Sequence, residues 1–91
     1  MNKNEAKILI VDDIEDNRYT LERSLKKDGY ENISLADCGK DALNLVNESK
    51  FDLILLDLMM PDISGLDVLK QLKGNPSQRN IPVIMAVSYT H

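Results

Sequence analysis

Short apolar runs alternate with amphipathic segments along the chain. Continuous apolar runs cover residues 7–11 (KILIV), 52–56 (DLILL) and 81–87 (IPVIMAV), whereas residues 32–36 (NISLA) alternate between polar and apolar positions. Continuous runs are typical of parallel strands covered on both faces. We therefore predict four strands, with residues 32–36 nearest an edge of the sheet.

The segments between these runs predict three helices. Residues 15–28 and 39–49 each place apolar side chains on one helical face, and a leucine recurs every three residues through 66–72. Gly29 follows the first segment as a stop signal, and the turn at 74–76 (GNP) ends the third. The alternation of strands and helices predicts one α/β domain with a parallel sheet and right-handed crossovers.

Composition excludes several classes of protein. The chain has 91 residues and a formal charge of -4, and a negative charge argues against direct binding of nucleic acid. No run approaches the ~18 apolar residues of a membrane helix, and the N-terminus does not resemble a signal peptide. The single cysteine, Cys38, suits a reducing compartment, and we interpret it as a small residue near a helix start. A cytoplasmic location without membrane insertion is expected.

Three acidic residues end two of the predicted strands. Asp12 and Asp13 follow the first predicted strand, and Asp57 follows the third predicted strand along the chain. Ligands of open α/β sheets bind beyond the carboxyl ends of strands, so these carboxylates share one crevice if their strands are neighbours. Mutual repulsion then favours a cation, and oxygen ligands suit Mg²⁺. The alternative is that aspartates simply favour turns and caps, with Asp13 capping the first helix.

Three motifs together resemble the receiver domain of bacterial two-component response regulators. They are ILIVDD, FDLILLDLMMPDISGLDVL and NPSQRNIPVIM, and the resemblance extends from about Lys7 to Met85. It implies a flavodoxin-like, doubly wound parallel sheet with strand order 2-1-3-4-5, of which this chain would contain 2-1-3-4.

The resemblance also implies a set of roles. Asp57 would accept a phosphoryl group from the phosphohistidine of a sensor histidine kinase or phosphotransfer protein. Asp13 and Asp57 would bind Mg²⁺ through their carboxylates, Met59 through its backbone carbonyl, and Asp12 through a water molecule. Such a domain is not an enzyme in its own right, because it assists only its own phosphotransfer and dephosphorylation.

The residues after Asp57 predict a sharp turn. Pro61 fixes φ and removes a backbone donor, so the chain must leave the strand, and Gly65 permits a tight entry into the next helix. We expect this turn to hold Asp57 exposed at the rim of the sheet.

The chain departs from the family near its C-terminus. A receiver places Ser or Thr at the end of the fourth strand, where this sequence has Val87, with Ser88 one residue later and Thr90 beyond it. A shift of one residue turns a strand side chain to the opposite face, so Ser88 is a weak candidate for the switch hydroxyl and Thr90 a weaker one.

The family pattern also includes a fifth strand ending in Lys and two further helices, which residues 1–91 do not encode. We therefore expect a single receiver domain over residues 1–91, truncated after the fourth strand. We also expect residues 87–91 to be atypical or foreign, His91 to have no metal or phosphotransfer role, and no output domain to be encoded in residues 1–91.

Two other functions are compatible with an acidic crevice. A Mg²⁺-dependent phosphatase of the haloacid dehalogenase type also forms an aspartyl phosphate. It requires a D-x-D-x-[TV] motif at the first strand, however, where this chain has adjacent acids. A receiver-like interaction module that is not phosphorylated is favoured by the absent hydroxyl and Lys.

Overall fold

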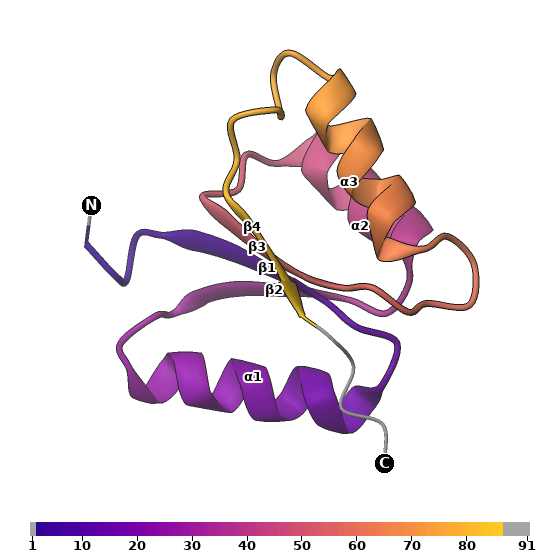
Figure 1. Ribbon diagram of the computed structural model, residues 1–91. Coiled ribbons are helices and arrows are strands. Elements are labelled where there is room, and N and C mark those ends of the chain that lie inside the picture. Colours follow the sequence, from indigo (N-terminus) through magenta and orange to yellow (C-terminus); the bar gives the residue numbers. More distant parts are fainter. Residues whose placement is uncertain (1, 87–91) are drawn as a thin grey trace.

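A parallel sheet lies between two layers of helices (Figure 1). The computed structural model describes residues 2–86. Helix α1 covers one face of the sheet, and α2 and α3 lie side by side on the other. In chain order, the elements are β1 (Lys7–Val11), α1 (Glu15–Lys27), β2 (Asn32–Ala36), α2 (Gly39–Glu48), β3 (Leu53–Asp57), α3 (Gly65–Gly74) and β4 (Val83–Ala86).

The strands follow the order β2-β1-β3-β4, and each neighbouring pair is parallel. This confirms the predicted α/β fold, the order 2-1-3-4 and the position of β2 at an edge of the described sheet. Strands β1 and β3 are neighbours whose register runs from Ile8 opposite Leu53 to Val11 opposite Leu56. Their carboxyl ends therefore lie next to each other.

The buried core lies mainly between the sheet and the α2–α3 layer. Leu9 and Leu56 have no exposed surface, and they belong to a cluster that includes Val46, Val68 and Leu72 from the two helices. By contrast, none of the side chains of α1 is buried. The sheet is thus more deeply packed on the face that α2 and α3 cover.

Two strand boundaries differ from the prediction for local reasons. Strand β3 extends to Asp57, because this residue pairs with Ala86 of β4. Strand β4 begins only at Val83, since Pro82 has no N–H for the ladder and the N–H of Ile81 donates to the carbonyl of Gln78 at 3.1 Å. Between residues 2 and 86, no helix has both the length and the apolar character required to cross a membrane.

The chain approaches itself closely where α3 begins. The N–H of Gly65 donates to the carbonyl of Leu58 at 3.0 Å. A Cβ atom at Gly65 would collide with the backbone oxygen of Asp57 and lie 2.9 Å from the Cα of Leu58. Because both neighbours are backbone atoms, they cannot move aside as a flexible side chain would. This position therefore admits only glycine without a shift of the loop.

We expect Gly65→Ala to lower the free energy of unfolding by about 1–3 kcal/mol, the usual cost of forcing extra volume into a filled site. Gly74→Ala is the matched control, because nothing lies within 4 Å of a Cβ there. It should raise stability by about 0.5–1 kcal/mol through helix propensity. Urea unfolding measures both, and equal stability of the two variants would contradict the close approach at Gly65.

Candidate functional site

The neighbouring carboxyl ends of β1 and β3 bring Asp12, Asp13 and Asp57 together. Each offers one carboxylate oxygen, and these atoms all lie within 4.8 Å of one another. Asp12 directly follows β1 and is 6% exposed, Asp57 ends β3 and is 1% exposed, and Asp13 is exposed. The structure thus places these three predicted residues in one cluster with two buried members and one open to solvent.

Asp12 organises the entry into α1. Its Oδ1 accepts a hydrogen bond from the N–H of Ile14 at 2.9 Å, and its Oδ2 accepts one from Asn17 Nδ2 at 3.2 Å. The N-cap of α1 is Ile14, which makes no side-chain cap. The alternative that Asp13 caps this helix is therefore wrong, because Asp12 binds the backbone at this turn and leaves the carboxylate of Asp13 facing solvent.

Asp57 has one satisfied and one unsatisfied oxygen. Its Oδ1 accepts a hydrogen bond from the N–H of Met59 at 3.2 Å, whereas its Oδ2 is buried and has no hydrogen-bond partner among residues 2–86. Burial raises the pKa of Asp57 above its usual value, the Met59 N–H opposes this, and the charges of Asp12 and Asp13 raise it further. An ionised Asp57 is thus held in an unfavourable environment that a cation would relieve.

The expectation that Asp57 lies exposed at the rim is wrong. The loop after β3 turns back at once, with Gly65 against the Asp57 backbone, and Asp12 lies beside the side chain. Only 1% of Asp57 is exposed as a result. The same loop exposes Met59, of which 70% is accessible, and Pro61 is also exposed. The positions of Val87, Ser88, Thr90 and His91 lie outside the described residues.

The guanidinium group of Arg18 lies close to this cluster but does not pair with its carboxylates. Arg18 Nη1 donates a hydrogen bond to the backbone carbonyl of Asp12 at 2.7 Å. No Lys or Arg in the described part of the chain forms an ion pair with any of the three acids. The sequence reasoning missed Arg18 and Asn17, although their spacing from Asp12 places both in the first turns of α1. Arg18 binds the backbone of Asp12 and Asn17 binds its side chain, so both hold Asp12 in place.

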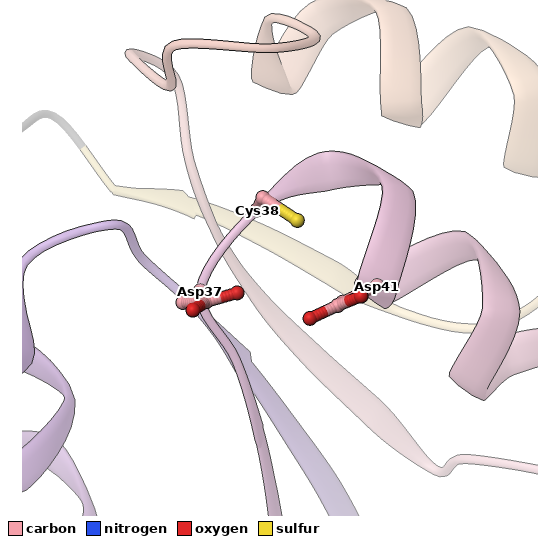
Figure 2. Close-up of side chains that lie close together, drawn as sticks. All are labelled: Asp37, Cys38 and Asp41. Atoms are coloured by element: carbon pink, nitrogen blue, oxygen red, sulfur yellow. The ribbon is translucent and has the colours of Figure 1, made fainter.

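A second group of possible metal ligands lies at the start of α2. Figure 2 shows the carboxylates of Asp37 and Asp41 turned toward one another, with Cys38 between them in the chain. The Asp41 N–H lowers the pKa of the Cys38 thiol, but burial and the carboxylates of Asp41, Asp62 and Asp37 outweigh this and leave the pKa raised. In this second group the thiol is protonated and both acids are exposed. The first cluster differs, because it contains a buried carboxylate oxygen with no hydrogen-bond partner among residues 2–86.

The first cluster has the chemistry of a site for a hard cation. Its donors are all carboxylate oxygens, which Mg²⁺ prefers. Oδ2 of Asp57 offers one ligand atom without breaking any hydrogen bond within residues 2–86. The same oxygen is free to act as a nucleophile. The arrangement therefore suits transfer of an anionic group to a carboxylate beside a divalent cation.

Comparison with known proteins shows which family the sequence matches. Residues 8–91 match the family described as response regulator receiver domain. The chain is 45% identical over 80 residues to the response regulator PleD of Caulobacter vibrioides, covering 88% of this chain and 17% of PleD. It is 39% identical over 82 residues to the polar-differentiation response regulator DivK of Brucella anthropi, covering 90% of this chain and 66% of DivK. The chain thus spans less than two thirds of either relative.

A solved structure of a response regulator shares the fold. The response regulator TrrA of Thermotoga maritima, whose structure is a complex with Mg(2+)-BeF, is 34% identical with a TM-score of 0.84. The alignment covers 94% of this chain and 72% of TrrA.

We expect Asp57→Asn to raise the free energy of unfolding at pH 7 in the presence of a chelator, because it removes a buried charge from among three carboxylates. A raised pKa means that the folded state holds the proton more tightly. Binding of this proton stabilises the folded state at low pH. That stabilisation is lost as pH rises above 3.8 through the folded pKa, and the asparagine variant avoids the loss.

The control for this measurement is Asp67→Asn, an exposed acid of α3 outside the cluster. It should give no such gain in urea unfolding. A less stable Asp57→Asn variant would contradict the electrostatic account of the site.

Proposed function

This chain belongs to the family of response regulator receiver domains, and from that premise we propose that it accepts a phosphoryl group on Asp57 in two-component signal transduction. The donor is the phosphohistidine of a sensor histidine kinase or phosphotransfer protein. The observation that carries the proposal is the buried Oδ2 of Asp57, which has no hydrogen-bond partner among residues 2–86 and lies beside two further carboxylates.

The proposed reaction forms one bond and breaks one. Oδ2 of Asp57 attacks the phosphorus of the phosphohistidine, a P–O bond forms, and the P–N bond breaks. The imidazole nitrogen leaves with the bonding electron pair and takes up a proton. Meanwhile the N–H of Met59 holds Oδ1 at 3.2 Å, which fixes the plane of the carboxylate and leaves Oδ2 directed away from that bond.

The ligands proposed for Mg²⁺ are the carboxylates of Asp13 and Asp57, the backbone carbonyl of Met59, and Asp12 through a water molecule. When bound, Mg²⁺ neutralises the charge that keeps a carboxylate and an anionic phosphoryl group apart. The bonds that Asp12 makes to Ile14 and Asn17 occupy both of its oxygens, which supports an indirect role for this residue.

Several finer features belong to the same proposal. The domain assists only its own phosphotransfer and dephosphorylation and acts on no separate substrate. It works in the cytoplasm, which its single cysteine suits, and it does not bind nucleic acid directly, in keeping with its formal charge of -4. A solved relative, the receiver domain of a signal transduction histidine kinase from Syntrophus aciditrophicus, supports the pairing with a kinase.

Treatment with acetyl phosphate and Mg²⁺ should add the mass of one phosphoryl group to the intact protein and nothing to Asp57→Asn, because that variant lacks the nucleophile. Intact-mass spectrometry makes the measurement, and Asp52→Asn, at the opposite end of β3, is the matched control. Sustained turnover of a phosphate ester would instead support the phosphatase alternative. A protein that folds and binds Mg²⁺ but takes no phosphoryl group would support the interaction module.

Titration with Mg²⁺ should show weak binding that Asp13→Asn and Asp57→Asn each abolish, because each removes a charged ligand from a site for a hard cation. Calorimetry or amide chemical shifts measure the affinity, with Asp41→Asn as a control from the second acidic group. Unchanged binding in Asp57→Asn would show that the cation lies elsewhere.

A further inference from the structure

We propose that Asp62 is a positioning residue for phosphoryl transfer to Asp57, because it fastens the loop after β3 to the first turn of α2. The inference rests on the proposed function of Asp57. It adds a residue whose carboxylate binds the start of α2 and acts through the backbone of the loop that carries Met59.

The first observation is a two-point hydrogen bond across the fold. Asp62 Oδ1 accepts from the N–H of Gly39 and Oδ2 from the N–H of Lys40, each at 3.0 Å. These are the first two residues of α2, whose N-cap, Cys38, makes no side-chain cap. Hydrogen bonds from the N–H groups of Lys40, Gly39 and Ile63 lower the pKa of Asp62 to about 2, so the carboxylate stays ionised at neutral pH. The loop thus supplies the cap that α2 lacks.

The second observation is close packing beside these bonds. A Cβ atom at Gly39 would lie 3.0 Å from the Cβ of Ile63 and 3.1 Å from Cγ2 of Val68. The backbone of α2 therefore lies against the residue that follows Asp62, and Ile63 in turn packs on the core. A contact made by two neighbouring loop residues constrains both the position and the direction of the loop.

The third observation concerns the rest of the loop, residues 58–64. Its ends are fixed at the strand by Met59 N–H on Asp57 Oδ1 and by Gly65 N–H on the carbonyl of Leu58. The Met59 side chain is 70% exposed, so packing does little to hold this residue in place. Met60 and Ile63 pack against the core, and the two hydrogen bonds of Asp62 to α2 add a directional polar restraint on the middle of the loop.

The consequence is that losing the Asp62 carboxylate should move the Met59 backbone without touching any of the three clustered acids. A displacement of about 1 Å in a positioned group can cost as much as about a hundredfold in rate. We expect a smaller effect, near tenfold, because both ends of the loop remain attached.

The experiment compares Asp62→Ala and Asp62→Asn with the unmodified protein and with Asp52→Asn. Asp52 also accepts a backbone N–H, from Lys7 at 2.8 Å, but at the far end of the sheet. In metal-free protein, the amide resonance of Met59 should shift in both Asp62 variants and stay unchanged in Asp52→Asn. Mg²⁺ affinity and the rate of phosphorylation by acetyl phosphate should each fall about tenfold in Asp62→Ala and less in Asp62→Asn, which keeps one acceptor oxygen.

Two outcomes overturn the proposal. One is an unchanged Met59 amide with wild-type Mg²⁺ affinity in folded Asp62 variants. The other is an equal loss in Asp52→Asn, which would assign the effect to general stability. Should Asp62→Ala fail to fold, Asp62→Asn answers the same question. If the unmodified protein takes no phosphoryl group, the proposed function fails, whereas the Met59 amide and the Mg²⁺ titration still decide the role of Asp62.

Discussion

The parallel pairing of β1 with β3 is the constraint on which the rest of the site depends. Parallel neighbours end at the same side of a sheet, so the acids that follow these strands meet whatever the loops do. Apolar residues in the centre of both strands drive that pairing, and they place charged groups close together at its end. Core packing of the strands therefore determines where the site lies. The residues placed there repel one another because all three are acidic.

Local polar contacts then give the three acids different tasks. Asp12 binds the backbone and Asn17, Asp13 faces solvent, and Asp57 keeps one oxygen that no group in the described part of the chain binds. Chemically identical side chains thus differ in which oxygens are bound and in how far the side chain is buried. Arg18 reinforces this division, because its bond to the Asp12 carbonyl steadies the loop without pairing with a carboxylate.

The sequence predicted what periodicity and strand order control. Three apolar runs and one alternating segment located the four strands, and the resemblance supplied their order, which the structure confirms. The burial of Asp57 was not predicted, because it depends on how tightly the loop returns at Gly65. The choice between Asp12 and Asp13 at the turn into α1 depends on one residue's backbone direction, which composition does not encode. The contact of Asp62 with α2 was not predicted either, because its partners lie 22 and 23 residues away in the sequence and no local pattern indicates such a contact.

Met59 has an exposed side chain and a backbone N–H that binds Asp57. This combination affects which substitutions the position can accept. The hydrogen bond to Asp57 comes from the main chain, so any residue other than proline supplies it equally. Inheritance of the acidic cluster therefore places no chemical demand on the side chain at this position. A substitution of this one exposed residue alters the surface next to Asp57 and leaves the hydrogen bond to Asp57 intact, so the surface can change separately from the acidic cluster.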